Sequence, residues 1–373
     1  MHRSACRLAF RVAMIGAVVV SMQLPSLPAR AQTATPPPAA AEVTPAPSPA
    51  QSAPPLASTP SAAPASLPTP AEPGKKGRET EARLLFGAAA SAAPLPARAI
   101  GFYAKGCLAG AEPLAIDGEA WQAMRLSRNR NWGHPKLIRL IERLAKEAKV
   151  EDGWPGLLVG DLSQPRGGPM LTGHASHQVG LDADVWLTPM PERRLSAQER
   201  EELSATSMLR ADGVEVDPAI WTEKHARLIL RAASFSEVDR IFVHPGIKKA
   251  MCERKDLDRK HLGKVQPYWG HHYHMHIRMT CPPESDGCTN QSSRPNDDGC
   301  GQEIEHWMKM VRKPPAPPGT PKPSPKALLT LDHLPADCKL VLQAGETPAP
   351  TLVAAKPAKK KIKSKTAKAS VTP

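Results

Sequence analysis

Histidines concentrate in one short stretch of the chain. Residues 271–276 read His-His-Tyr-His-Met-His, so four of the thirteen histidines of this 373-residue protein fall within six positions. Polar and apolar residues alternate over residues 273–279, a period typical of a strand. His274, His276 and Arg278 would then share one strand face. Because residues two apart on a strand face lie about 6.5–7 Å apart, two imidazoles placed this way can converge on one metal ion.

A second polar group lies earlier in the chain. His177 precedes Asp184 by seven positions, and the alternating run 181–186 places Asp182 and Asp184 on one strand face. A turn that contains His177 can fold back over the strand end that contains Asp184. Two neutral imidazoles and one carboxylate form a common catalytic zinc set, which leaves a fourth position for water. The two motifs together predict zinc held by His177, Asp184 and one histidine of the strand at 273–279.

Other chemistries fit these residues less well. Calcium and magnesium take mainly oxygen ligands. The chain has no Cys-x-x-Cys pair for a structural zinc site and no His-Glu-x-x-His motif to supply a glutamate base. A histidine must then act as the general base, and imidazole has a suitable pKa. Ser176 lies between two histidines without a nucleophile elbow around it, so a serine mechanism is not expected.

The combined motifs resemble the zinc metallopeptidase superfamily that contains lysostaphin-type enzymes, D-Ala-D-Ala carboxypeptidases and the hedgehog pseudo-peptidase. More narrowly, residues 98–340 resemble the penicillin-insensitive murein endopeptidases. The segments that carry this resemblance are Asn131-Trp132-Gly133-His134-Pro135, Gly173-His174-Ala175-Ser176-His177-Gln178, Arg240-Ile241-Phe242-Val243, His271-x-x-His274-Met275-His276 and Gly299-Cys300-Gly301.

The resemblance implies a function and a set of roles. It implies one zinc ion per chain, held by His177, Asp184 and His276, with His274 as the general base. It implies hydrolysis of the D-alanyl-meso-diaminopimelate cross-link of peptidoglycan. Because penicillin acylates serine, a zinc hydrolase of this kind should resist it. His274 could instead be a further zinc ligand or orient one.

Several neighbouring residues keep more than one interpretation. His271 could stabilise a tetrahedral oxyanion, orient the substrate, or be an exposed loop histidine. His174 could bind the metal in a substrate-free state, contact the substrate, or be an ordinary loop residue. Asp182 could fix a histidine tautomer or cap the backbone. His272 would point away from the others on a regular strand, and His134 begins a helix as a structural or cleft-lining residue.

An accessory metal site is disfavoured. Members of the family can carry an Asp followed three residues later by a His that binds a second metal. The corresponding residues here are Asp212 and Glu215, so a glutamate stands in place of the histidine. These two residues stay candidate ligands, but one zinc per chain is the expected stoichiometry.

The two ends of the chain differ in composition from its middle. Residues 1–31 combine a basic start, a short apolar run and a small-x-small cleavage site, which predicts a cleavable signal peptide and export to the periplasm. Residues 32–79 form a spacer rich in Pro and Ala. The zinc peptidase domain is expected over 80–312, followed by a Pro-rich spacer at 313–326. The Lys-rich tail 346–373 is expected to be disordered.

The number of cysteines and the net charge further restrict the class of protein. Six cysteines lie outside the predicted signal, and in an exported protein they predict three disulfides. The resemblance implies the pairs Cys107–Cys338, Cys252–Cys300 and Cys281–Cys288, of which the first would tie segment 327–345 back onto the domain. The net charge of +13 includes four arginines of the signal and seven lysines of the tail, so the middle carries only +2. Nucleic-acid binding is therefore not indicated, and no later stretch is long and apolar enough to span a bilayer.

Hydrophobic periodicity predicts the supporting elements. Helices are expected over 134–149 and 222–233, and after a capping box at Ser196 and Glu199. Residues 157–161 and 238–243 read as further strands. These signals predict an α+β fold in which a small antiparallel sheet carries the zinc site, flanked by helices and cross-linked by disulfides.

Three other functions compete with the endopeptidase. A D,D-carboxypeptidase that trims terminal D-Ala would use the same zinc set. A wall-binding zinc module without hydrolytic activity is the second, although such a module would often have lost the base. A histidine-rich metal carrier is the third and would bind several ions weakly. The expected partner is the peptide cross-link of peptidoglycan, and a homodimer is left open.

Overall fold

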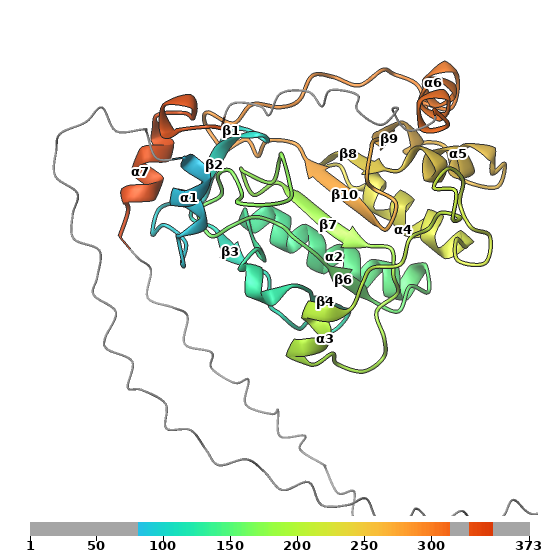
Figure 1. Cartoon of the computed structure of the whole chain (residues 1–373), viewed down its shortest axis with the longest axis horizontal. Coiled ribbons are helices and arrows are strands. Elements are labelled where there is room, and N and C mark those ends of the chain that lie inside the picture. Colours follow the sequence, from blue (N-terminus) through green and yellow to red (C-terminus); the bar gives the residue numbers. More distant parts are fainter. Residues whose placement is uncertain (1–80, 314–327, 346–373) are drawn as a thin grey trace, which may run out of the picture. The chain divides into compact units, whose positions relative to one another are not determined.

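The computed structural model describes residues 81–313 and 328–345 (Figure 1). The predicted signal peptide, the N-terminal spacer and the Lys-rich tail lie outside the described residues, as does the Pro-rich spacer except for Lys313. Within the described ranges, no helix has the length and hydropathy needed to cross a bilayer.

A six-stranded mixed sheet lies at the centre of the domain (Figure 1). Its order is β4 (Trp121–Ala123), β6 (Leu157–Val159), β7 (Asp182–Trp186), β10 (His274–Met279), β8 (Val238–Val243) and β9 (Val265–Pro267). The four inner strands pair antiparallel, which confirms the predicted antiparallel core. The edge strands β4 and β9 extend the sheet by parallel pairing, which the sequence had not indicated.

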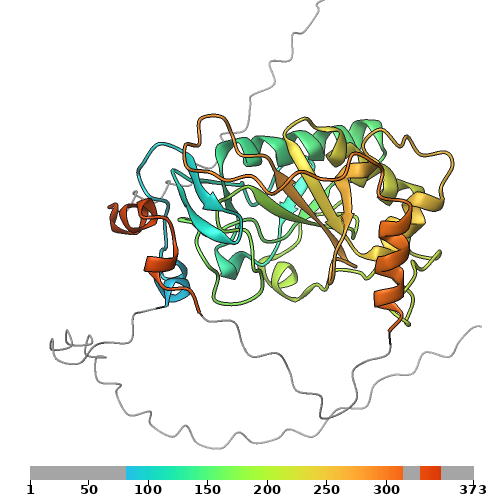
Figure 2. The same cartoon turned by 90° about the horizontal axis from the view of Figure 1, so that it is seen from above.

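The two faces of the sheet have different environments. Met275, Ile277 and Met279 of β10 are at most 1% exposed and join the main hydrophobic cluster. Helices α2 (Pro135–Glu151) and α4 (Glu223–Ser234) contribute their apolar sides to the same cluster. Figure 2 shows α2 lying across this face. The alternate residues of β7 and β10, which carry the candidate ligands, therefore lie on the opposite face.

The predicted helices are present close to their expected positions. Helix α2 begins after His134, whose Nδ1 accepts a hydrogen bond from the Lys136 N–H, and Pro135 occupies its first turn. The capping box of Ser196 and Glu199 opens α3 (Ala197–Glu202). The remaining helices are α1 (Ala82–Gly87), α5 (Pro245–Glu253), α6 (Gln302–Val311) and α7 (Asp337–Gln343), with 3₁₀ turns η1 (Leu126–Arg128), η2 (Leu262–Lys264) and η3 (Leu331–His333). Two small hairpin-like sheets pair β1 (Arg98–Phe102) with β2 (Lys105–Ala109), and β3 (Glu112–Pro113) with β5 (Trp132–Gly133).

Three disulfides join the predicted cysteine pairs. Cys107–Cys338 links β2 to α7, Cys252–Cys300 links the end of α5 to the residues before α6, and Cys281–Cys288 closes a loop directly after β10. Arg166 adds to the first link, because its guanidinium donates hydrogen bonds to four carbonyl groups of residues 341–345. Segment 328–345 is thus held to the domain by one covalent bond and one buried cation.

Candidate metal centre and active site

His177 is fixed in its orientation before any ligand binds. Its backbone lies in the left-handed region at φ 67°, which is uncommon for a residue other than glycine. Its N–H donates to Asp182 Oδ2 at 3.0 Å, and its ring Nδ1–H donates to the Leu162 carbonyl at 2.6 Å. Because Nδ1 carries the proton, Nε2 holds a lone pair, and it lies 3.4 Å from Asp184 Oδ1.

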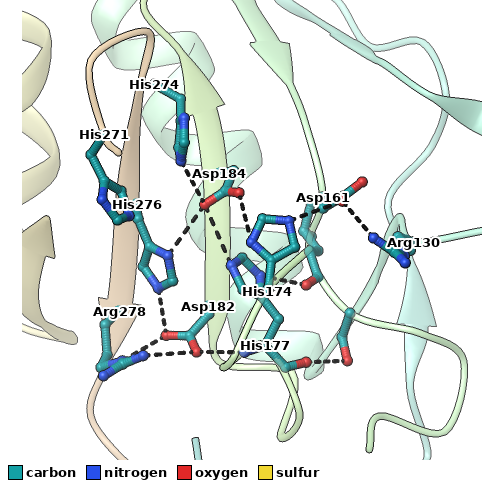
Figure 3. Close-up of polar contacts among 12 residues, drawn as sticks. Arg130, Asp161, His174, His177, Asp182, Asp184, His271, His274, His276 and Arg278 are labelled. Carbon is teal, nitrogen blue, oxygen red and sulfur yellow. Dashed lines mark hydrogen bonds and ion pairs between the residues drawn. The ribbon is translucent and has the colours of Figure 1, made fainter. Parts of the chain in front are cut away.

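His276 approaches the same carboxylate from the neighbouring strand. The sheet register places His276 of β10 directly opposite Asp184 of β7. His276 Nδ1 lies 3.3 Å from Asp184 Oδ1, and its Nε2 lies 3.1 Å from Asp182 Oδ1 (Figure 3). Burial acts to lower the pKa of His276, but the two carboxylates outweigh it and raise the pKa. Each ring nitrogen of His276 thus lies at ion-pair distance from a different carboxylate, Nε2 from Asp182 and Nδ1 from Asp184.

These three side chains fit a metal ion. Within the described residues, His177 Nε2 and Asp184 Oδ1 have no hydrogen-bond partner although both are buried. Two imidazole lone pairs and a carboxylate oxygen repel one another unless a proton or a metal cation lies between them. Two nitrogens and one oxygen at one point form a ligand set typical of zinc in hydrolases. The orphaned atoms therefore support metal binding by His177, Asp184 and His276.

Asp182 holds two of these ligands in place. It is fully buried, and it accepts the His177 N–H and contacts His276. Arg278 adds two hydrogen bonds, at 2.7 Å to Oδ1 and 3.2 Å to Oδ2. Burial acts to raise the pKa of Asp182, but Arg278 and His276 hold the pKa far below its ordinary value. Both sequence interpretations of Asp182 apply, since it caps a backbone N–H and orients a histidine.

His174 lies at the same centre. Its Nδ1 is 3.5 Å from Asp184 Oδ2, and possible ligand atoms of His174, His177 and Asp184 all lie within 4.8 Å of one another. Its Nε2 contacts Asp161 Oδ2 at 3.0 Å. The structure thus places His174 where it can act as a further ligand, with Asp161 orienting its ring.

Asp161 was missed by the sequence analysis. It lies two residues after the end of β6 and accepts hydrogen bonds from Arg128 and Arg130, each at 3.0 Å. Burial acts to raise its pKa, but the hydrogen bond and charge of His174 and the two arginines lower it to about 2. The signal was an acidic residue at the end of a strand, and only the pairing of β6 with β7 makes it informative.

His274 and His271 complete the histidine group. His274 Nε2 lies 3.6 Å from Asp184 Oδ1, and burial lowers the pKa of this ring despite the nearby carboxylate. His271 Nδ1–H donates to the Trp269 carbonyl at 2.6 Å. Burial, followed by the charges of His276 and His274, lowers the pKa of His271 to about 3. Both rings are therefore neutral near pH 7.

Two cavities meet at the metal centre, and His174 lines both. The larger has a volume of about 370 Å³ and is lined by Phe102, Ala104, His174, Ala175, Ser176, Phe242, Tyr268, His271, His276, Arg278 and Gln291. The smaller has about 120 Å³ and is lined by Arg125, Arg128, Gly160, Asp161, His174, Asp184, Trp186, Tyr273 and His274. Both cavities are therefore lined by residues of the histidine and aspartate cluster.

The comparison with known proteins agrees with this arrangement. Residues 99–343 match the family described as penicillin-insensitive murein endopeptidase. The chain belongs to that family. It is therefore a peptidase, and the matched residues include every residue of the histidine and aspartate cluster.

Individual relatives show the same similarity. The penicillin-insensitive murein endopeptidase of Haemophilus influenzae is 42% identical over 237 residues, which are 61% of this chain and 77% of that protein. The Yersinia enterocolitica protein of the same name is 41% identical over 245 residues, covering 66% and 85%. That of Salmonella paratyphi A is 39% identical over 251 residues, covering 67% and 88%.

The structure places four other singled-out residues away from the cluster. His272 Nδ1 contacts Ser207 Oγ at 3.0 Å and takes no part in the metal centre. His134 caps α2. Asp212 accepts a hydrogen bond from the Val214 N–H within its own loop. Glu215 Oε1 lies 3.0 Å from Arg312 and 3.6 Å from Lys249.

Proposed function

We propose that this protein is a zinc-dependent D,D-endopeptidase that hydrolyses D-alanyl-meso-diaminopimelate cross-links of peptidoglycan and is insensitive to penicillin. One observation carries the proposal: within the described residues, His177 Nε2 and His276 Nδ1 lie 3.4 and 3.3 Å from the same Oδ1 atom of Asp184, and His177 Nε2 and that oxygen are buried without a hydrogen-bond partner. Family membership supplies the peptidase activity, and this ligand set supports zinc as its metal.

The residues around the metal would have different roles. Zinc, when bound, supplies a Lewis acid that makes water nucleophilic near neutral pH and polarises a carbonyl. His177, Asp184 and His276 hold it, and His174 is a further candidate ligand. Asp182, whose Oδ1 lies 3.1 Å from His276 Nε2, is placed to orient the His276 ring toward the metal. Calcium and magnesium fit poorly, because two of the three principal ligands are nitrogens.

His274 is the best-placed proton acceptor. Its ring is nearly buried and neutral, and its Nε2 lies close to Asp184. A neutral imidazole can take a proton from the attacking water and return it to the leaving amine. The Nδ1–H of His271 is committed to the Trp269 carbonyl, so a neutral His271 presents only an acceptor at Nε2. We therefore favour orientation of a substrate N–H by His271 over stabilisation of an oxyanion.

The shape of the site favours an endopeptidase over a carboxypeptidase. A carboxypeptidase needs room for only one small residue beyond the scissile bond. Here cavities of about 370 and 120 Å³ adjoin the metal centre on two sides. Arg125 and Arg128 line the smaller cavity and can attract the carboxylates of a diaminopimelate-containing peptide. A wall-binding module without activity would not require a neutral buried His274 beside the ligands.

The site of action follows from the N-terminal sequence. We propose that residues 1–31 direct export to the periplasm, where peptidoglycan is the accessible substrate. Residues 80–312 would form the peptidase domain, with segment 327–345 attached to it through Cys338.

The mature protein should be incubated with cross-linked muropeptide dimers, and the products identified by mass spectrometry. Monomers should form in the presence of penicillin, disappear when a chelator removes the metal, and return with one equivalent of zinc. Loss of a single alanine from an intact dimer would instead identify a carboxypeptidase. No product from a protein that binds one zinc would favour the wall-binding module, and several weakly bound ions would favour a metal carrier.

Two variants from one stretch of sequence give a matched control. His276→Ala should bind zinc at least 100-fold more weakly and lose the activity. His272→Ala removes a neighbouring imidazole that contacts Ser207 and the ring of Tyr273 rather than the candidate ligands, and should keep both metal affinity and activity. Equal losses in the two variants would exclude the proposed ligand set.

A further inference from the structure

Three aromatic side chains form a patch beside the larger cavity. Tyr268 and Trp269 lie in the loop between β9 and β10, and Trp307 lies on α6; we call these three the aromatic patch. The Trp307 ring centroid is 5.5 Å from that of Trp269 and 6.3 Å from that of Tyr268, with the planes tilted by 62° and 48°. The three rings are thus neighbours that do not lie in one plane.

The patch is unusual for this chain. Tyr268 is 51% exposed and Trp269 is 48% exposed, and they are the only aromatic residues among the large exposed hydrophobic side chains of the described ranges. The whole sequence has only 5 Phe, 7 Trp and 3 Tyr. Exposing two of these adjacent to a third costs hydrophobic free energy, so an exposed apolar cluster of this kind marks a binding surface.

The aromatic patch adjoins the larger cavity. Tyr268 lines that cavity, and its ring lies 5.6 Å from the ring of His271. The ring of His271 in turn lies 5.6 Å from that of His276. A ligand that packs on Tyr268 therefore lies at the wall of this cavity.

The position of α6 is well fixed. Ile304 and Met308 of this helix are buried, and the Cys252–Cys300 disulfide joins the residues before it to α5. Trp307 is thus carried by an anchored helix, although its partners Tyr268 and Trp269 belong to a distant loop. The aromatic patch thus combines side chains of two separate elements, one of which is an anchored helix.

We propose that the aromatic patch binds a saccharide ring of the glycan strand to which the cleaved peptide is attached. This inference rests on the proposed function, because it identifies the part of the substrate that extends beyond the cross-link. The cross-link peptide itself carries small and charged side chains, which gain little from stacking on indole rings. A pyranose ring instead has C–H faces that pack against aromatic faces, while its hydroxyl groups stay in water.

The distance agrees with the chemistry of the substrate. Two successive ring-centroid separations of 5.6 Å lead from His276 through His271 to Tyr268, and Trp307 lies 6.3 Å beyond Tyr268. A stem of four extended residues spans up to about 13–14 Å. A peptide cut at the metal centre can therefore reach Tyr268, at the near edge of the aromatic patch.

Two dimers with identical peptides test the proposal, one with its disaccharides attached and one with the sugars removed. The full-length mature protein should cleave the sugar-bearing dimer with the higher kcat/KM. Trp307→Leu should lower kcat/KM on that dimer by about tenfold, equivalent to 1.4 kcal/mol, and leave the sugar-free dimer unchanged. Trp307→Phe keeps an aromatic face and should retain most of the preference.

Equal effects on both dimers, or no effect on either, would overturn the proposal. A control variant, Val150→Ser, removes a 70% exposed apolar side chain at the end of α2 and should change neither substrate. Loss of a concentration-dependent dimer in Trp307→Leu, without a sugar-dependent effect, would assign the patch to self-association and would also overturn the proposal.

Direct binding separates this proposal from the activity. A tetramer of N-acetylglucosamine should quench tryptophan fluorescence of the wild-type protein, and Trp269→Leu should weaken that binding about tenfold. If the wild-type protein cleaves neither dimer but binds the tetramer through the aromatic patch, the proposed function is contradicted and the sugar site is supported. Absence of tetramer binding would contradict the sugar site.

Discussion

Replacing Asp182 with Asn tests the buried network under the metal centre. Asp182 is fully buried, and within the described residues it is the only acidic side chain that forms an ion pair with Arg278. The Arg278 side chain is itself only 8% exposed. The substitution keeps the size of the side chain and one acceptor oxygen. It removes the negative charge, and it turns an N–H₂ group toward groups that are themselves donors.

The magnitude follows from the burial of the pair. Removing one partner of a buried ion pair costs about 3–5 kcal/mol, because the other charge is left uncompensated. The retained acceptor for the His177 N–H favours the lower end of that range. At about 2–4 °C per kcal/mol for a domain of this size, Asp182→Asn should lower Tm by about 6–12 °C. Since the pKa of Asp182 lies below its ordinary value, this contribution is present at neutral pH and is lost only as the pH falls through the folded-state pKa.

The assay is thermal unfolding at pH 7 with a chelator present, so that metal binding makes no contribution. A second measurement is zinc affinity, which should fall about 10–100-fold because His276 loses the carboxylate that orients it. The double variant Asp182→Asn/Arg278→Gln carries no buried net charge and should recover at least half of the lost stability, but not the zinc affinity. A change in Tm below 2 °C in the single variant, or no recovery in the double variant, would refute the reasoning.

Three further predictions concern proton uptake, a disulfide and the base. Burial lowers the pKa of His134 and His244 to about 4, so the free energy of unfolding falls by up to about 3 kcal/mol for each histidine as the pH falls from 6.5 toward 4. The double variant His134→Asn/His244→Asn keeps both capping acceptors and should lose less stability between pH 7 and pH 4.5, as measured by urea unfolding. Cys107→Ala/Cys338→Ala should cost about 2–5 kcal/mol and expose residues 328–345 to trypsin. His274→Gln should lower kcat about 10²–10⁴-fold while zinc affinity, measured by titration, changes little.

Much of the fold could be predicted because the sequences of the helices and inner strands have a clear hydrophobic periodicity. The pattern around Met275 and Ile277 identified both faces of β10, and His134 followed by Pro135 marked the start of α2. The edge strands β4 and β9 were not predicted, because each has only three residues and pairs with a strand distant in sequence. A run this short carries too little periodicity to be recognised.

The site was predictable where one motif contained several of its members. The His-x-His strand and the run from His177 to Asp184 each contain two polar residues on one face, so spacing alone brought them together. Asp161 and Arg130 were missed, because each stands alone in the sequence and joins the site only through the pairing of β6 with β7. Glu215 stands where family members carry a His ligand, and this change disfavoured a second metal site. Its carboxylate lies beside Arg312 and Lys249, and a ligand role for it stays untested.

The candidate metal ligands come together only through the register between β7 and β10. His276 lies opposite Asp184, and Arg278 lies opposite Asp182. A slip of β10 by one residue would turn its histidines toward the helices and its apolar residues toward the opposite face. A slip of two residues in one direction would keep the faces but place Arg278 opposite Asp184, where its guanidinium would occupy the cation position. Metal binding to the native arrangement therefore stabilises the native pairing against these two alignments.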